Sequence, residues 1–434
     1  MRRSLVPLLL LAALAADLGQ AQTWRPLVPA GGLPPRRNAA AICDPSGDRV
    51  LLFGGRGSSG DRADLWALDL ATDSWSELPA GAGPSPRFTH VAVHDPVGRD
   101  LVVWSGRAID SQGTRLFDDV WVYDLQSGTW RGVATGDPRP ARRYGSAAIY
   151  DPRRRGLVAF AGFTDEGRFE DTWRLDLESG AWRQVAVAGT PGRRCLHSAA
   201  YDPVGHRMLV YGGQRTGALG DLWALDLEAG TWAEITPVDG PPARFFAAAA
   251  YQPGGHRLLI FGGDTGAEKR GDLWAFDLAA GGWEELHPGG PAPAPRDGAV
   301  AVFVPSRGRL VLFGGTSDQH LGDTWYLDGL EVGPPSTAVE DGAAAPVPLL
   351  LQAYPNPVNG QVTVRFAGGP GRLEVRDLLG QLVRRLSVGD ASTATGEQVW
   401  DGCDAAGRPV ASGVYVIRLA TGQGTRSARV VVAR

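Results

Sequence analysis

The sequence predicts an all-β protein in which six four-stranded blades form a propeller and a β-sandwich follows. Three repeated features predict this fold. A Gly-Gly pair or its replacement recurs at intervals of 50 to 56 residues, at Gly55, Gly106, Gly162, Gly213, Gly263 and Gly315. An arginine lies 19 residues before each of these glycines, and a pair of tryptophans nine residues apart follows five of them. Repeats of roughly 50 residues that each contain four strands are typical of propeller blades.

The four strands of a unit follow its arginine in a fixed order. A short apolar run such as "SAAIY" leads into a turn such as "DPVGHR", where proline fixes φ and glycine permits a positive φ. A second run such as "RLLIFGG" ends at the glycine pair. After a loop of variable length, the third strand alternates with a period of two, as in "DLWALDL" from Asp64. The fourth strand begins at the second tryptophan.

Taken together, these landmarks resemble the kelch family. The shared features are an arginine at the start of strand one, Gly-Gly at the end of strand two, and a tryptophan in each of strands three and four. The resemblance covers about residues 23–333. Two units depart from it locally, at Trp104-Ser105-Gly106 and at Ala161-Gly162, but a small residue remains in both. The resemblance implies a six-bladed kelch β-propeller of the galactose oxidase and kelch superfamily.

The sixth unit lacks its second tryptophan, and this absence predicts how the ring closes. Nine residues after Trp325 the chain has Pro334, within "EVGPPS", which is not a strand. The segment "TWRPLVPAGG" at residues 23–32 is similar to every fourth strand and its exit. We therefore expect Trp24 to begin the fourth strand of blade six, so that the propeller spans residues 22–333 and two sheet edges are removed.

The N-terminus has the pattern of a secretory signal peptide. Arg2 and Arg3 give a basic start, residues 5–15 are apolar but too few to span a bilayer, and small residues lead to cleavage near Ala21. We expect residues 1–21 to be removed and the mature chain to have no membrane-spanning segment. An uncleaved anchor is the alternative.

Cysteine content and charge narrow the class of protein. Cys43, Cys195 and Cys403 are odd in number and lack metal-like spacing, so we expect unpaired thiols. The formal net charge of −4 gives no reason to expect nucleic acid as a partner.

The C-terminal segment has a different pattern. Residues 334–346 contain an alanine- and proline-rich linker, and residues 347–434 contain short alternating strands, as in an immunoglobulin-like β-sandwich. Four words occur in order: Tyr354-Pro-Asn-Pro357, Asp377-Leu-Leu-Gly380, Trp400-Asp-Gly-x-Asp404-x-x-Gly407 and Ser412-Gly-Val-Tyr415. They resemble the FlgD-like immunoglobulin fold and the similar C-terminal sorting domain of type IX secretion substrates. That resemblance implies an exported bacterial protein whose tail engages the secretion machinery, although Arg434 replaces the lysine-rich ending of many such domains. A plain structural appendage is the alternative.

The candidate binding site lies at one mouth of the propeller channel. In a kelch propeller strand one lines the axis, so the six arginines should surround that mouth, with three aromatic residues beside them: Arg36, Arg87, Arg143, Arg194, Arg244, Arg296, Phe88, Tyr144 and Phe245. Guanidinium groups and aromatic rings around a concave surface suit carboxylates, acidic sugars or an acidic loop of a partner. The competing interpretation is that the arginines bind neighbouring backbone and carboxylates between blades.

The sequence offers no set of residues that requires a cofactor, a metal or a catalytic centre. The seven histidines are spread out, and His206 and His256, like His90 and His197, occupy equivalent repeat positions. The copper ligands and Cys–Tyr crosslink of the oxidases that resemble galactose oxidase have no visible counterpart. Asp401 and Asp404 lack the regular oxygen ligands of an EF-hand, so a solvated turn is expected there.

These observations predict a secreted or cell-surface bacterial binding protein. The propeller would recognise a protein or glycan partner, and the C-terminal domain would direct export or anchoring. A carbohydrate-active enzyme, either an oxidase or an epimerase, and a passive surface-layer protein are the alternatives.

Overall fold

A computed structural model of the chain describes residues 22–28, 32–79, 81–235, 239–331, 350–354, 361–367, 371–377, 381–386, 395–421 and 424–432. The expected signal peptide and the expected linker lie outside these residues.

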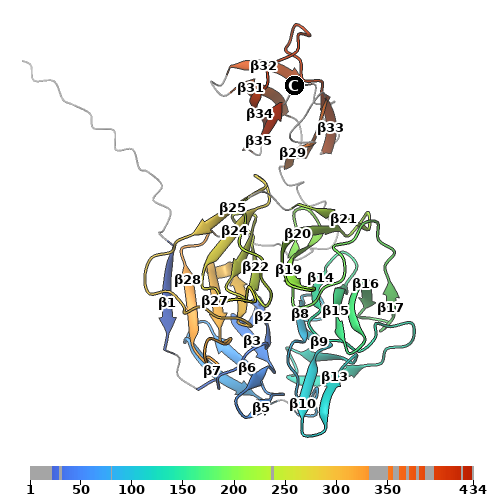
Figure 1. The fold of residues 1–434 in the computed structure, drawn as a ribbon, viewed down its shortest axis with the longest axis vertical. Coiled ribbons are helices and arrows are strands. Elements are labelled where there is room, and N and C mark those ends of the chain that lie inside the picture. The colour runs from blue at the N-terminus through green and yellow to red at the C-terminus, as the bar shows by residue number, and fades with distance from the viewer. Residues whose placement is uncertain are drawn as a thin grey trace, which may run out of the picture.

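Six four-stranded antiparallel sheets form the propeller (Figure 1). Blade one contains β2 (Ala40–Asp44), β3 (Arg49–Phe53), β6 (Leu65–Asp69) and β7 (Ser74–Leu78). Blade two contains β8 (Val91–Asp95), β9 (Asp100–Trp104), β12 (Val120–Asp124) and β13 (Thr129–Val133). Blade three contains β14 (Ala147–Asp151), β15 (Gly156–Thr164), β16 (Gly167–Asp176) and β17 (Trp182–Gln184).

The remaining three blades repeat this plan. Blade four contains β18 (Ser198–Asp202), β19 (Arg207–Gln214), β20 (Ala218–Asp226) and β21 (Thr231–Glu234). Blade five contains β22 (Ala248–Gln252), β23 (Arg257–Phe261), β24 (Leu273–Asp277) and β25 (Gly282–Leu286). Blade six contains β26 (Val300–Val304), β27 (Arg309–Phe313), β28 (Thr324–Asp328) and, from the start of the chain, β1 (Thr23–Leu27).

The first strands of adjacent blades contact one another all around the ring, so they line the axis. Two loops between second and third strands form small hairpins of their own. In blade one these are β4 (Arg56–Gly57) and β5 (Gly60–Asp61), and in blade two β10 (Arg107–Asp110) and β11 (Gly113–Leu116).

The hydrophobic core lies between blades, and the fourth-strand tryptophans explain why. Trp130 of blade two packs on Phe53 of blade one, with ring centroids 5.1 Å apart. Each blade repeats this contact with the aromatic residue that directly precedes the glycine pair, or its replacement, in the preceding blade. The other pairs are Trp24–Phe261, Trp75–Phe313, Trp182–Trp104, Trp232–Phe160 and Trp283–Tyr211. The tryptophan repeat is therefore a packing feature of the propeller.

β1 and β28 lie side by side and close the ring (Figure 1). Trp24 lies opposite Leu327 in this pairing and is 2% exposed. Its neighbour is thus the third strand of blade six, which is the partner that the missing sixth tryptophan predicts.

The C-terminal residues form two antiparallel sheets. One contains β29 (Leu350–Tyr354), β30 (Val362–Ala367) and β33 (Thr395–Trp400), and the other contains β32 (Leu382–Leu386), β31 (Gly371–Asp377), β34 (Gly413–Thr421) and β35 (Gly424–Val432). Trp400 is fully buried in the core, its indole N–H donates to the carbonyl of Cys403 at 2.9 Å, and its ring meets that of Tyr415. Asp401 and Asp404 are bonded to Arg384 and Arg408 in the turn.

The all-β fold class, with a propeller followed by a sandwich, is confirmed. Several residues of the C-terminal sequence words, including 355–357 and 378–380, lie outside the described residues.

Candidate functional site

The six repeated arginines lie inside the blades. Each is at most 1% exposed. In blade one, Nη1 and Nη2 of Arg36 lie 2.6 and 2.8 Å from Oδ1 and Oδ2 of Asp64, which precedes the third strand. The same two-pronged pair recurs in each blade as Arg87–Asp119, Arg143–Asp171, Arg194–Asp221, Arg244–Asp272 and Arg296–Asp323. Bidentate geometry of this kind is the strongest that arginine forms with a carboxylate.

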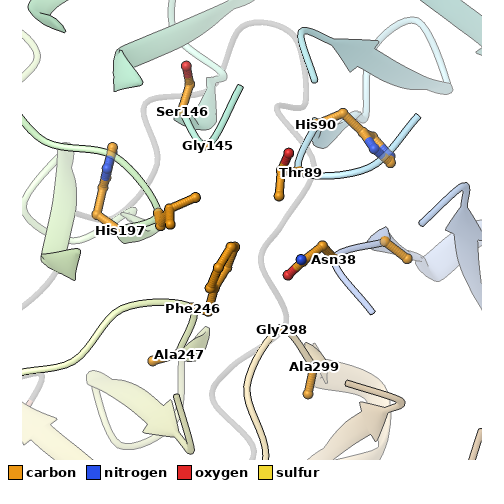
Figure 2. A pocket seen from close by; sticks show the side chains of 12 residues that line it. Asn38, Thr89, His90, Gly145, Ser146, His197, Phe246, Ala247, Gly298 and Ala299 are labelled. Carbon is orange, nitrogen blue, oxygen red and sulfur yellow. The ribbon is translucent and has the colours of Figure 1, made fainter. Parts of the chain in front are cut away.

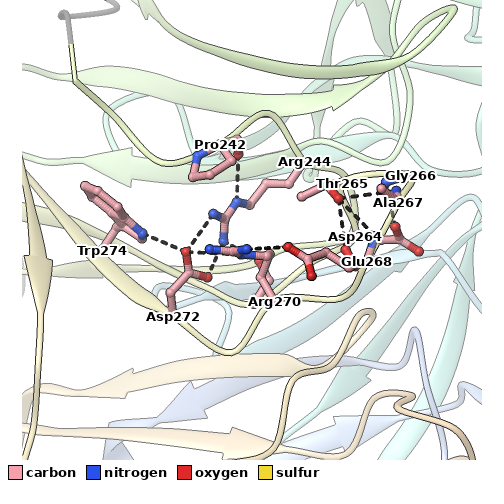
Figure 3. Close-up of polar contacts among 11 residues, drawn as sticks. Pro242, Arg244, Asp264, Thr265, Gly266, Ala267, Glu268, Arg270, Asp272 and Trp274 are labelled. Carbon is pink, nitrogen blue, oxygen red and sulfur yellow. Dashed lines mark hydrogen bonds and ion pairs between the residues drawn. The ribbon is translucent and has the colours of Figure 1, made fainter.

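Each arginine and aspartate pair has further partners in its own blade, as Figure 3 shows for blade five. Arg244 also donates to the carbonyls of Pro242 and Gly262, both at 2.9 Å, and the indole of Trp274 donates to Asp272. Burial alone would raise the pKa of the Asp272 carboxyl, but the hydrogen bond and charge of Arg244 outweigh burial and hold that pKa below its usual value. The carboxylate therefore stays ionised and paired.

The main chain of each arginine connects its blade to the preceding one. The carbonyl of Arg87 accepts a hydrogen bond of 2.9 Å from the N–H of Gly55, and the N–H of Arg87 donates to the carbonyl of Arg62. The glycine has a φ of 97°, which any side chain would strain. The side chain thus holds one blade together while the backbone fastens it to the next.

This geometry corrects the expectation that the six arginines bind a ligand. A guanidinium that is buried and already bonded to a carboxylate and two carbonyls is not accessible to another molecule. Arg36, Arg87, Arg143, Arg194, Arg244 and Arg296 are structural, as the competing interpretation held. Their carboxylate partners come from the same blade, however, and only the backbone bonds cross between blades.

Two residues after each arginine, the chain forms a hydrogen-bonded ring around the axis. The ring members all have a positive φ and each N–H donates to the carbonyl of the preceding member; they are Asn38, Thr89, Gly145, Leu196, Phe246 and Gly298. These residues and their successors line a cavity of about 130 Å³. Figure 2 shows the side chains of Asn38, Thr89 and Phe246 around it. The opening is therefore polar on one side and apolar on the other.

His90 and His197 border this cavity, but their rings pack between blades. The His90 ring is directed away from the centre in Figure 2 and meets the ring of Phe53 edge-on at 5.4 Å. His197 meets Phe160 in the same way. We call the six repeated, aspartate-paired arginines the frame arginines. Burial, together with the charge of the nearby frame arginine (Arg87 or Arg194), lowers the pKa of each imidazole to about 3. Within the described ranges, no three His, Cys, Asp or Glu side chains are grouped so that they could hold a metal ion.

The surface around the cavity is built by the residue after each arginine and the residue after each glycine pair, which face each other as isolated antiparallel bridges. We call this surface the mouth face. Its six pairs are Arg37–Arg56, Phe88–Arg107, Tyr144–Phe163, Cys195–Gln214, Phe245–Asp264 and Asp297–Thr316. The backbone arrangement is the same in every blade, but the side chains differ in size and charge from one blade to the next.

Guanidinium groups and aromatic rings alternate across the mouth face of blades one to three. Phe88 lies between Arg56 and Arg107, with ring-to-Cζ distances of 5.3 and 4.7 Å, and Arg107 lies 4.0 Å from the Tyr144 ring. Tyr144 meets Phe163, and Arg168 lies over Phe163 at 5.1 Å. We call these six residues the arginine–aromatic row: Arg56, Phe88, Arg107, Tyr144, Phe163 and Arg168.

Only part of the predicted site is therefore accessible from the surface. Phe88 is 1% exposed, so its ring faces are not available, whereas Tyr144 and Phe245 are half-buried at the mouth face. Sequence reasoning missed Arg37, Arg56, Arg107 and Arg168. The signal was present for three of them, because Arg37 directly follows a repeated arginine and Arg56 and Arg107 directly follow repeated glycines.

On blades five and six the mouth face carries acidic side chains. Asp264, Glu268 and Asp318 line a cavity of about 350 Å³ together with Lys269. The Lys269 ammonium lies 3.3 Å from Asp297 and also donates to the carbonyl of Ser317. The mouth face of blades five and six therefore carries carboxylates.

Comparison with known proteins agrees with this architecture. The family described as the KLHDC2/KLHL20/DRC7 Kelch-repeats domain matches residues 16–191 and 160–331. The chain belongs to the kelch-repeat family. Residues 355–425 of this kelch protein match the FlgD Ig-like domain, which confirms the resemblance of the C-terminal sandwich.

Relatives of the kelch propeller are found in plants and animals. The putative adagio-like protein 2 of Oryza sativa subsp. japonica is 33% identical over 203 residues, which are 45% of this chain and 30% of the relative. Host cell factor 2 of Homo sapiens is 29% identical over 42% of this chain and 25% of its own length. The chain thus spans less than a third of these relatives. A solved structure titled "Structure of YjhT" matches 69% of this chain and 97% of its own at a TM-score of 0.54 and 15% identity, which supports the fold alone.

No helix in the described parts of the chain has the length and apolar character needed to cross a bilayer.

Proposed function

We propose that this kelch protein is an exported binding protein whose mouth face recognises a partner protein. The observation that carries the proposal is the contrast between the repeated frame and the surface that it supports. Six identical arginine–aspartate pairs fix the backbone, while the six bridged pairs beside them all differ. A rigid frame that displays different side chains is the arrangement that selective recognition requires.

The choice of a protein over a glycan rests on the state of the aromatic rings. Phe88 is buried between two guanidinium groups, and Tyr144 has Arg107 against its ring. These rings leave little open platform on which a sugar could stack. The kelch repeats themselves also favour a protein-binding role. An acidic glycan is the competing ligand and is tested below.

The C-terminal domain supports the exported part of the proposal. Its match to the FlgD Ig-like domain, together with the signal-peptide pattern at residues 1–21, fits a chain that leaves a bacterial cytoplasm. We propose that residues 347–434 engage the secretion machinery and place the propeller at the cell surface or outside it. The propeller would then bind the partner protein, and the C-terminal sandwich would direct export of the chain.

The enzymatic alternative has no supporting observation among the described residues. His90 and His197, which border the axial cavity, are buried between blades, and their lowered pKa keeps them neutral at physiological pH. A neutral, enclosed imidazole cannot reach a substrate in the channel.

Site-specific crosslinking tests the proposed binding face. A photoreactive amino acid is placed at Tyr144 on the mouth face or at Val204, an exposed residue in a hairpin turn of blade four. Each purified chain is exposed to surface extract of the source bacterium and irradiated. We expect a discrete protein adduct from position 144 and none from position 204. Equal adducts from both positions, or none from either, would contradict the proposal.

A further inference from the structure

We propose that the arginine–aromatic row, together with Arg37, binds an extended acidic segment of the partner protein. This inference rests on the proposed function, since it assumes a protein partner at the mouth face. It adds the place where the partner lies, which is over blades one to three, and the chemistry that is recognised.

The first observation that supports this inference is that several guanidinium groups at the site have no carboxylate partner. Among the residues that the structure describes, Arg37, Arg107 and Arg168 form no ion pair with a carboxylate, and all three are half-buried. Arg56 is the exception in this group, because it lies 2.7 Å from Asp61. Partly desolvated guanidinium groups without a counter-charge favour an oxyanion more strongly than exposed ones do.

The second support is the crowding of like charges around Arg107. Burial comes first, and the nearby charges of Arg37 and Arg56 add to it, in lowering the pKa of the Arg107 guanidinium below its usual value. The Tyr144 and Asp61 side chains oppose this shift only in part. An anion placed among these guanidinium groups would relieve the repulsion, so binding and local stability are linked.

The aromatic rings set the geometry of the site. Arg107 has the Tyr144 ring at 4.0 Å and the Phe88 ring at 4.7 Å, so its guanidinium lies over two aromatic rings. Cation–π contacts of this kind do not use the N–H groups as hydrogen-bond donors to a carboxylate, so these groups stay available for a ligand. The row therefore holds its guanidinium groups in fixed positions, which reduces the entropy lost when a ligand binds.

The spacing of the row fits an extended peptide. The Cζ atoms of Arg56 and Arg107 lie 5.3 and 4.7 Å from the Phe88 centroid, which places them no more than 10.0 Å apart. An extended chain advances about 3.3 Å per residue, so this separation is bridged by about three residues. Arg168 extends the row to blade three. A segment of roughly eight residues with two or three carboxylates would cover it.

The carboxylates of blades five and six limit where the acidic segment can lie. Asp264 and Asp318 line the cavity of blades five and six, and Asp297 holds Lys269 there. Carboxylates on that side repel an acidic ligand, and like charges across an interface suppress wrong poses. The acidic part of the partner is therefore directed to blades one to three.

The test starts from a random octapeptide library displayed on phage and selected on the full mature chain. We expect enrichment of peptides with two or more Asp or Glu residues.

A synthetic peptide of the enriched sequence is then titrated against the wild type and two double variants. Arg37→Gln with Arg107→Gln should weaken binding at least about tenfold. Arg99→Gln with Arg153→Gln, two exposed arginines in hairpin turns remote from the row, should change it less than about twofold. The Arg107→Lys variant keeps the charge but not the planar fork, so an intermediate loss is expected.

The outcomes separate the inference from the proposed function. If enriched peptides bind at the mouth face but carry no acidic residues, or if the double variant binds them as well as the wild type, the inference is overturned and the proposed function stands. If heparin or polygalacturonate binds through Arg37 and Arg107 while acidic peptides do not, the ligand is an acidic glycan and the inference fails. If no peptide is enriched and no crosslinked protein is found, both are overturned.

Discussion

The N–H of Gly315 in blade six donates a hydrogen bond of 2.9 Å to the carbonyl of Arg36 in blade one, and this bond joins the last repeat to the first. The other five blades make the same contact with their neighbours. The Arg36 side chain meanwhile holds its own blade through Asp64. One residue type thus builds each blade and links it to the next, which explains why the arginine recurs at a fixed distance from the glycine pair.

Removing a frame arginine should strongly destabilise the propeller. In Arg143→Ala the partly buried carboxylate of Asp171 loses its buried partner, and breaking a buried ion pair costs about 3–5 kcal/mol. The measurement is the free energy of unfolding from urea titration. Arg153→Ala, at an exposed turn of the same blade, should change it by less than about 0.5 kcal/mol. A loss below about 1 kcal/mol in Arg143→Ala would show that the pair is not a structural element.

The second glycine of the pair should not accept a side chain. Gly315 has a φ of 96°, and an added Cβ would lie 2.8 Å from the carbonyl oxygen of Asp297. We expect Gly315→Ala to cost at least about 2 kcal/mol of unfolding free energy, because backbone strain and a backbone clash add. Gly32→Ala is the matched control, since its Cβ would meet no atom within 4 Å. Equal stability of the two variants would contradict the role assigned to Gly315.

The buried histidines make the fold sensitive to acid. His90 and His197 have a folded pKa of about 3 against 6.5 as the ordinary value, so between these values the unfolded chain binds protons that the folded chain excludes. The two histidines therefore do not lower the free energy of unfolding above pH 6.5, and that free energy falls as the pH decreases from 6.5 towards 3. At pH 4.5 each histidine should lower the free energy of unfolding by about 2–3 kcal/mol relative to pH 7. His90→Gln should reduce the difference in unfolding free energy between pH 7 and pH 4.5, whereas His287→Gln at a more exposed position should not. An unchanged difference in His90→Gln would refute the assignment.

The C-terminal domain should be dispensable for the propeller but needed for delivery. A chain ending at residue 346 should keep the thermal unfolding transition of the propeller, because among the described residues the core clusters of the blades contain none from the sandwich. Under the proposed function, in which a bacterium exports the chain, the shortened chain should accumulate inside the cell envelope and disappear from the outer surface. Fractionation followed by immunoblotting measures this. Surface display of the shortened chain would show that the domain is a structural appendage.

The sequence carried enough information for the fold but not for the site. The period, the glycine pairs and the absent tryptophan after Trp325 each report on backbone geometry or interblade packing, and these constraints are the same in every repeat. For that reason the pairing of Trp24 with blade six could be expected from the repeat phase alone.

The site required information that a repeat pattern hides. A recurring arginine is read equally well as a ring of ligand contacts or as a structural pair, and the sequence did contain the deciding signal. An aspartate is the first residue of each repeated third-strand motif, such as "DLWALDL" from Asp64. Every frame arginine therefore has an equally repeated acidic residue, as Arg36 has Asp64. The stacking of Arg107 between Phe88 and Tyr144 joins residues of two blades, and no local spacing predicts it.

The affinity of Arg107→Gln for the selected acidic octapeptide, compared with that of Arg87→Gln, tests the central claim most directly. We assign Arg107 to recognition of the partner and Arg87 to the structural frame of the blades. Under conditions where both variants are folded, Arg107→Gln should bind at least about tenfold more weakly than the wild type, with its unfolding free energy changed by no more than about 1 kcal/mol. Arg87→Gln should lose several times more stability and, while folded, bind like the wild type. The reverse result, with binding lost in Arg87→Gln and kept in Arg107→Gln, would contradict the account.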